Sequence, residues 1–193
     1  MIDLHPTADN LGALISSIPD GDLGQPTPCS EYTVGDLLDH IGRLAGAFAS
    51  AARKEDGTNA SPPPPGDRAN LGDDWRTRIP RDLLVLGDAW ESPDAWAGTT
   101  KIAGMEMPAG VVGTVGLNEV VTHGWDLARA IGQPFDADHD SIEGCLEFIG
   151  PISEPGAEAN RAPAFGPPMT PPDDASPVDR LIALTGRDPG WTP

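Results

Sequence analysis

Apolar residues recur along this chain every three or four positions, which is the period of a helix with one buried face. Stretches with this period alternate with connections rich in proline and glycine, and no segment repeats another. The pattern therefore predicts a helical protein without internal repeats. We expect its helices near residues 9–18, 34–52, 67–91, 110–131, 138–149 and 176–186.

Short sequence signals mark the ends of several predicted helices. Thr33 and Asp36 resemble a capping box, with Asp in place of the usual Glu. Asp9 is a candidate N-cap for the first helix, and Gly132 is placed to end the long apolar helix. Pro80 should kink or split the helix in which it falls, because proline has no N–H for the helical hydrogen bond.

The order of the predicted elements indicates an all-α fold. A long crossover, residues 93–108, has the alternating pattern of an extended strand and precedes the apolar helix at 110–131. This order is typical of an antiparallel helical bundle of mixed connectivity. Further along, the chain becomes rich in proline until a short helix at 176–186. We therefore expect a helical bundle at 1–150 and a proline-rich C-terminal tail at 151–193, whose one short helix packs on the bundle.

The composition is strongly acidic. The chain has 30 Asp and Glu against 12 Lys and Arg, which gives a net charge of −18 and a pI near 4.2. Such a surface repels phosphate backbones and anionic lipid, so we expect no nucleic-acid and no membrane partner. No apolar run reaches the roughly 18 residues of a membrane-spanning helix, and the N-terminus lacks the pattern of a signal peptide. These features predict a cytoplasmic protein and leave its oligomeric state open.

The two cysteines lie far apart and form no CxxC pair, so a cytosolic chain keeps them reduced. Cys145 falls within an apolar helical pattern and is expected to be a small core residue. Cys29 comes just before a predicted helix, where the helix dipole could lower the pKa of its thiol. No histidine lies near Cys29 in sequence, so its role stays open.

The most distinctive motif places a carboxylate and an imidazole inside the apolar helix at 110–131. Glu119 and His123 are four residues apart, so they lie on one helix face, one turn apart. Such a pair can hold a metal ion with a third ligand from a neighbouring helix, or it can simply be a surface hydrogen bond. His40 borders the apolar face of the helix at 34–52 and alone would be a semi-buried histidine. Because bundles place metal sites between facing helices, the three residues form a candidate metal site.

Other polar residues are not predicted to be ligands of this site. Asp126 lies on the same helix face as His123, where it could accept a hydrogen bond from an imidazole N–H and orient the ring. A pairing of Asp126 with Arg129, three residues further, explains it equally well. His5 and His139 are expected to be solvated surface residues.

Three segments together carry a resemblance to a known family. They are residues 27–40, 119–126 and 184–189, which read TPCSEYTVGDLLDH, EVVTHGWD and LTGRDP. In combination they resemble the metal-binding domain family of mycothiol-dependent maleylpyruvate isomerase, an actinobacterial group within the DinB-like superfamily. The resemblance spans most of the chain. It implies a DinB-like four-helix bundle with a long crossover, followed here by the short C-terminal helical tail.

The resemblance also implies a ligand set and a reaction class. The first histidine ligand of the family maps onto His40, and its helical E-x-x-x-H pair maps onto Glu119 and His123. Zinc is the default ion for two histidines and one carboxylate, although nickel, iron and manganese also fit. Mycothiol would be the low-molecular-weight thiol, and its partner a small electrophile. No residue beyond the ligands is indicated as catalytic.

One departure from the family affects the predicted function. The isomerase has a second lobe after its bundle, and residues 151–193 are too few for that lobe. Two functions therefore remain. The first is a metal-dependent thiol transferase or isomerase, and the alternative is a non-catalytic bundle that binds a metal or a small ligand. Thiol-dependent turnover distinguishes them.

Overall fold

The computed structural model describes residues 1–55, 59–157, 159, 161 and 165–193. The protein is mostly helical, as predicted, with one two-stranded antiparallel sheet. Four of its helices are α1 (His5–Ser17), α2 (Val34–Ala52), α3 (Trp75–Trp90) and α5 (Ala109–Ile131). The remaining elements are η1 (Asp20–Asp22), η2 (Arg68–Asn70), α4 (Pro93–Trp96), β1 (Thr99–Ile102), β2 (Met105–Pro108), α6 (His139–Ile152) and α7 (Pro177–Leu184).

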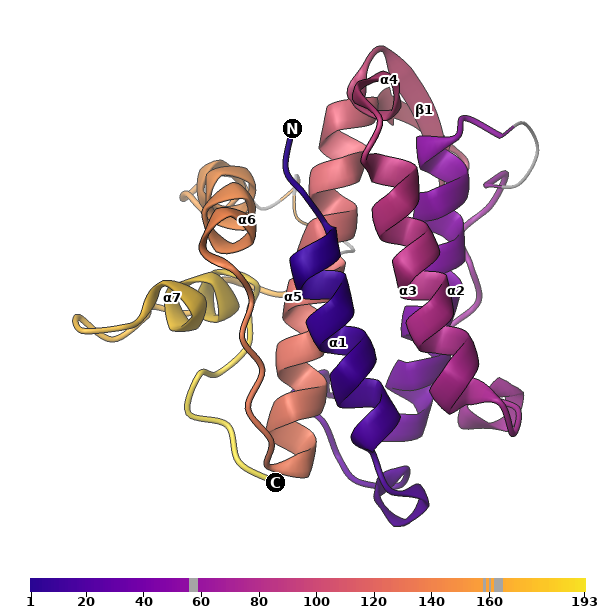
Figure 1. Cartoon of the computed structure of the whole chain (residues 1–193). Helices are drawn as coiled ribbons and strands as arrows, with labels where there is room; N and C mark the ends of the chain where they lie inside the picture. The colour runs from indigo at the N-terminus through magenta and orange to yellow at the C-terminus, as the bar shows by residue number, and fades with distance from the viewer. Residues whose placement is uncertain (56–58, 158, 160, 162–164) are drawn as a thin grey trace.

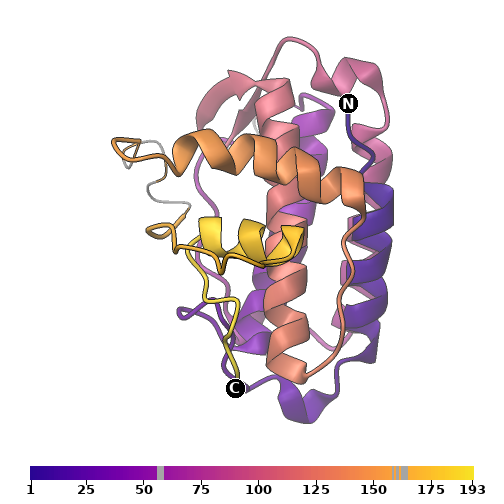
Figure 2. The same cartoon turned by 90° about the vertical axis from the view of Figure 1, so that its left-hand side faces the viewer.

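Helices α1, α2, α3 and α5 run side by side around a shared apolar core (Figure 1). α3 packs against α1 and α2, and α5 packs against the same two helices from the other side. α6 and α7 lie across the outer face of α5, as the second view shows (Figure 2). None of the helices in the described part of the chain is long and apolar enough to cross a membrane.

The first helix begins earlier than the sequence predicted. α1 starts at His5, so Asp9 lies inside the helix and the prediction of Asp9 as its N-cap is wrong. Pro6 occupies the first turn, where a missing N–H costs nothing because that group has no helical partner. Thr7 is buried in the same turn and donates a hydrogen bond to Asp138 at 2.9 Å. This contact ties the added turn to the start of α6.

The predicted capping box is confirmed at the start of α2. The Thr33 hydroxyl accepts from the Asp36 backbone N–H, and the Asp36 carboxylate accepts from the Thr33 backbone N–H at 3.0 Å. The helix ends at Ala52, as predicted. The cap fixes the first turn of α2 and so the rotation of the residues that follow it, including His40.

Pro80, which was expected to kink or split its helix, does not split it. α3 runs without interruption through Pro80, although it begins at Trp75 instead of near residue 67. The proline leaves the carbonyl of Arg76 without its helical N–H. The hydroxyl of Ser16 on α1 lies 3.4 Å from that oxygen, but its one hydrogen has a closer acceptor in the carbonyl of Gly12, at 2.9 Å. The neighbouring helix therefore offers the freed carbonyl only a weak contact, and α3 continues because it packs against α1 and α2.

The crossover between α3 and α5 contains the predicted extended structure. β1 and β2 form a hairpin in which Ile102 pairs with Met105. Ala103 and Gly104 form its two-residue turn, both with positive φ, as a tight hairpin requires. The Thr100 hydroxyl donates to the carbonyl of Ala51 at 2.6 Å, which anchors the hairpin to the end of α2.

α5 is the central helix of the fold and follows the predicted bounds closely. It ends at Ile131, and Gly132 adopts the left-handed conformation of a helix C-cap, with φ of 65°. Gly116 allows a close approach of α2, because a Cβ at this position would lie 3.0 Å from the ring of Phe48. This approach brings the polar residues of α5 within reach of those on α2.

Candidate metal centre

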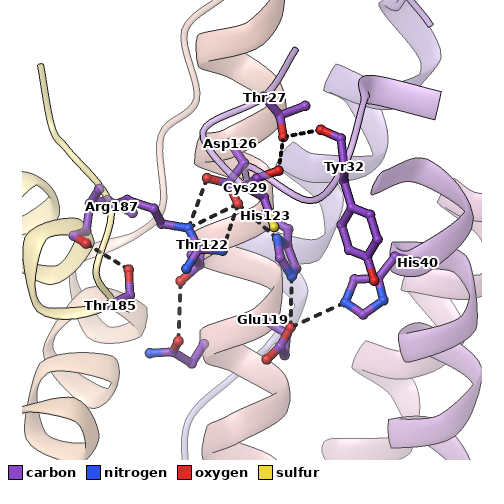
Figure 3. Close-up of polar contacts among 12 residues, drawn as sticks. Thr27, Cys29, Tyr32, His40, Glu119, Thr122, His123, Asp126, Thr185 and Arg187 are labelled. Atoms are coloured by element: carbon purple, nitrogen blue, oxygen red, sulfur yellow. Dashed lines mark hydrogen bonds and ion pairs between the residues drawn. The ribbon is translucent and has the colours of Figure 1, made fainter. Parts of the chain in front are cut away.

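The three residues predicted as metal ligands meet between α2 and α5. His40 projects from α2 toward Glu119 and His123 of α5 (Figure 3). Glu119 Oε2 lies 3.0 Å from His123 Nε2 and 3.9 Å from His40 Nε2. One ligand atom from each residue lies within 4.8 Å of the other two. We call these three residues the triad.

The donor set of the triad fits a divalent ion. Zinc bonds to histidine nitrogen and carboxylate oxygen are about 2.0–2.2 Å, so adjacent donors of a tetrahedral site lie about 3.3 Å apart. The carboxylate oxygen of Glu119 is 3.0 Å from the nitrogen of His123 and 3.9 Å from that of His40, so one distance is shorter and one longer than the roughly 3.3 Å between zinc donors. The spacing of Glu119 from both histidines is therefore close to that of donors around one ion.

The triad borders a cavity of about 320 Å³, which we call the polar cavity. Its walls come from the loop before α2, from α2 and α5, and from the C-terminal part of the chain. Three ligands on one side of an ion leave its remaining position open to such a space. The lining residues are Cys29, Glu31, Tyr32, His40, Leu44, Asn118, Glu119, Thr122, His123, Phe165 and Arg187.

His123 is held by a chain of charged hydrogen bonds. Its Nδ1 lies 3.0 Å from Oδ2 of Asp126, the residue predicted to orient this ring. Asp126 is fully buried and accepts from Arg187 Nε and Nη2, both at 3.0 Å. The alternative pairing of Asp126 with Arg129 is not what the structure has, because Arg129 donates to the carbonyl of Pro189 instead.

This chain of contacts sets the protonation of its members. Burial by itself would lower the pKa of His123, but the hydrogen bonds to Asp126 and Glu119 outweigh it and raise the pKa to about 8. Burial opposes ionisation of Asp126 too, yet the charge of Arg187 and the contact with His123 hold its pKa below the usual value. The pKa of Glu119 is lowered by His123 in the same way, against the effect of burial.

His40 has different surroundings. Its ring centroid lies 5.2 Å from that of Tyr32 and 5.1 Å from that of His123, the latter pair edge to face. Burial, together with the neighbouring His123, lowers the pKa of His40 to about 4. His40 is therefore neutral at physiological pH, which is the form that binds metal.

Cys29 lies in the wall of the polar cavity. Its Sγ is within 4.8 Å of ligand atoms on His123 and Asp126. Burial raises the pKa of the Cys29 thiol to about 11, so the expectation that a helix dipole lowers it is wrong. The thiol is held protonated, which argues against a nucleophilic role. Cys145, by contrast, is a fully buried core residue, as predicted.

The two remaining histidines lie outside the site. His139 is exposed at the start of α6, as predicted. His5 is partly buried at the start of α1, with Nε2 3.5 Å from a carboxylate oxygen of Asp88. The expectation that His5 is a solvated surface residue is therefore wrong, because α1 begins at this residue and its ring is partly buried.

Sequence reasoning missed two residues that shape the site. Tyr32 packs on His40, and Arg187 holds Asp126. Both fall inside the segments that carried the family resemblance, 27–40 and 184–189, but no local spacing connects either of them with α5. Their position within those segments was the one sequence signal that could have linked them to the site.

Comparison with known proteins places the chain in a family. The family model of the mycothiol maleylpyruvate isomerase N-terminal domain matches residues 4–128, which include the triad and Asp126. The uncharacterized proteins Rv0738 and MT0763 of Mycobacterium tuberculosis, strains H37Rv and CDC 1551, are each 28% identical over 192 residues. Those alignments cover 93% of this chain and 92% of each relative.

Solved structures agree in fold. A crystal structure of mycothiol-dependent maleylpyruvate isomerase has a TM-score of 0.59, and a mutant form of that enzyme has 0.58, each at 19% identity. Each similarity covers 76% of this chain and 66% of the isomerase chain, so the protein spans just under two thirds of that enzyme. Since the family model matches well over half of the chain, this protein belongs to the family of the mycothiol maleylpyruvate isomerase N-terminal domain.

Proposed function

We propose that this protein binds a divalent metal ion through His40, Glu119 and His123. With this ion it would act on a small electrophile as a transferase or isomerase that depends on a mycothiol-type thiol. The observation that supports this most is the triad itself, whose donor atoms meet at the wall of a 320 Å³ cavity. We further propose that residues 1–150 are a DinB-like four-helix metal-binding bundle and that residues 151–193 are a tail packed on it.

The metal would be held by Nε2 of each histidine and an oxygen of Glu119. Zinc is the first candidate for this donor set, and nickel, iron and manganese are compatible with it. Bound here, the ion would lower the pKa of a coordinated thiol and polarise a carbonyl. The free cysteines Cys29 and Cys145 fit a protein of the reducing cytoplasm.

The protein's own residues supply orientation and enclosure. Asp126 holds the ring of His123 through Nδ1, which leaves Nε2 directed at Glu119. Tyr32, Phe165 and Leu44 give the cavity apolar walls. A volume of 320 Å³ is at the low end of small-molecule sites, which favours a compact electrophile over a long one.

Metal analysis of the purified protein tests the premise. Wild type loaded with zinc or nickel is expected to retain one ion after desalting, and His123→Ala is expected to retain none. His139→Ala is a matched control, because His139 is an exposed histidine outside the site. Equal metal content in wild type and His123→Ala would remove the basis of the proposal.

Turnover of electrophiles with and without mycothiol tests the reaction. Thiol-dependent, metal-dependent turnover supports the transferase or isomerase. A metal-loaded protein without such turnover would instead favour the non-catalytic binder.

A further inference from the structure

Arg187 reaches the metal centre from the far end of the chain. It follows α7 and lies 61 residues after Asp126, outside the region that the family model matches. Its side chain is 13% exposed, and its Nε and Nη2 both bond the carboxylate of Asp126. Figure 3 shows this guanidinium beside Asp126, on the side away from the triad.

The segment that carries Arg187 is held in place by other contacts. Arg161 donates to the carbonyls of Leu184 at 2.7 Å and Gly166 at 3.0 Å. Arg129 donates to the carbonyl of Pro189. The backbone N–H of Arg187 bonds the carbonyl of Ile182 at 3.2 Å. The path of the segment therefore does not depend on the Arg187 side chain.

Gly186 gives this segment the turn that directs Arg187 inward. Its φ is +92°, a conformation that side chains rarely adopt. A Cβ at Gly186 would also lie 3.0 Å from the carbonyl oxygen of Pro167. Both constraints place the turn directly after α7, so that the next residue faces α5.

We infer that Arg187 is a positioning residue of the metal centre, which acts on His123 through Asp126; this inference depends on the metal binding proposed above. Within the described residues, the carboxylate of Asp126 accepts hydrogen bonds from His123 and Arg187 alone. The two-pronged contact fixes the orientation of the carboxylate plane. The fixed Oδ2 then holds Nδ1–H of His123, so Nε2 presents its lone pair to the ion.

Without Arg187, one side of this buried carboxylate would have no partner. Asp126 could then rotate about its own side-chain torsions, and the ring of His123 would follow it. Contacts of this kind typically change metal affinity by about 10–100-fold. The C-terminal segment would thus be part of the metal site, although it supplies no ligand.

Cobalt binding to the full-length protein tests this inference. Affinity is measured by competition with a chelator, and the visible absorption of bound Co²⁺ reports the geometry of its ligands. Arg187→Met keeps the length of the side chain without its donors, and we expect it to lower affinity by about 10–100-fold and to alter the spectrum. Arg187→Lys restores a charge but not the two-pronged contact, and we expect an intermediate affinity.

Arg129→Met is the matched control. It removes another arginine contact with the same segment, at Pro189, without touching Asp126. We expect its affinity and spectrum to equal those of wild type. A loss of cobalt affinity in Arg129→Met as large as that in Arg187→Met would overturn the inference. Docking of the C-terminal segment would then explain the affinity without the contact between Arg187 and Asp126.

The remaining outcomes separate this inference from the proposed function. If wild type binds no cobalt, the metal centre itself is wrong. If wild type and Arg187→Met bind with equal affinity and equal spectra, the centre stands and the role of Arg187 is wrong. If Arg187→Met fails to fold, the affinity and spectrum of Arg187→Lys are used instead. An affinity and spectrum equal to those of wild type would contradict the positioning role of Arg187.

Discussion

The two histidines of the triad are held in place by different forces. His123 is the end of a chain of charged hydrogen bonds that runs through Asp126 to Arg187. His40 makes ring contacts with Tyr32 and His123 but, within the described residues, no hydrogen bond of its own. The pKa of His123 is accordingly raised to about 8, whereas that of His40 is lowered to about 4.

From this difference we expect that the half of the candidate site on α5 is fixed before an ion binds and that the half on α2 is adjustable. α5 supplies Glu119 and His123 with their positions already set, 3.0 Å apart. α2 supplies His40, which is held by packing and lies 3.9 Å from Glu119. A side chain held by packing alone can rotate at low cost, so we expect His40 to complete the coordination as the ion binds.

The largest expected effect is the loss of a ligand. His123→Ala and His40→Ala should each lower zinc affinity by more than about 100-fold, since each removes one of three protein donors. Their effects on the metal-free protein should differ. His123→Ala removes a partner of the buried Asp126 and should lower the free energy of unfolding, whereas His40→Ala removes a desolvated ring and should change it little. Chelator competition and urea unfolding measure the two quantities.

A second test compares the carboxylates beside the two histidines. Asp126→Asn leaves Arg187 buried without its countercharge, which should cost about 3–5 kcal/mol of stability and lower metal affinity by about 10–100-fold. Asp39, next to His40, bonds Arg43 at 2.8 Å and the backbone N–H of Asp67 at 3.0 Å. Asp39→Asn should cost about 1–3 kcal/mol and leave metal affinity near that of wild type. Equal losses of affinity in both variants would contradict the distinction.

The fixed half of the site was only partly predictable from the sequence. The i, i+4 spacing of Glu119 and His123 and the helical period around His40 are local signals, so the triad could be assembled from them. Arg187 could not, because its contact with Asp126 depends on the path of the chain after a proline-rich segment. The direction of the pKa shift of Cys29 was predicted wrongly for the same reason, since the burial that raises this pKa depends on the tertiary fold.

The helices show the same division between local and tertiary information. The Thr33 and Asp36 cap is encoded within four residues and was predicted correctly. The continuity of α3 through Pro80 was not, because it depends on the packing of α3 against α1 and α2. Local sequence signals predict what a segment prefers by itself, and packing against other helices can change that outcome.

The pH dependence of the metal-free protein should distinguish the two halves of the site. His123, with its pKa raised to about 8, contributes stability that is fully present below about pH 6.5 and is lost as the pH rises through 8. His40, with its pKa lowered to about 4, makes stability fall as the pH drops from about 6.5 to 4. Each effect is worth about 2–3 kcal/mol.

Urea unfolding between pH 4 and 9 measures both effects on one protein. The wild-type curve should fall on both sides of about pH 6.5. His40→Ala should lose the decline attributable to His40 on the acid side, and His123→Ala the decline on the alkaline side. Curves that keep both slopes in both variants would assign the titration to other groups.

The smallest expected effect concerns the packing around His40. Tyr32→Phe keeps the ring against His40 but removes the hydroxyl that accepts from the Gly66 backbone N–H at 3.2 Å. We expect a loss of about 1 kcal/mol in unfolding free energy and little change in metal affinity. Tyr32→Ala, which removes the ring, should lower metal affinity as well, because the aromatic contact that restrains the ring of His40 is then lost. If both variants bind metal as wild type does, His40 is positioned by α2 alone, and the adjustable half of the site needs no aromatic support.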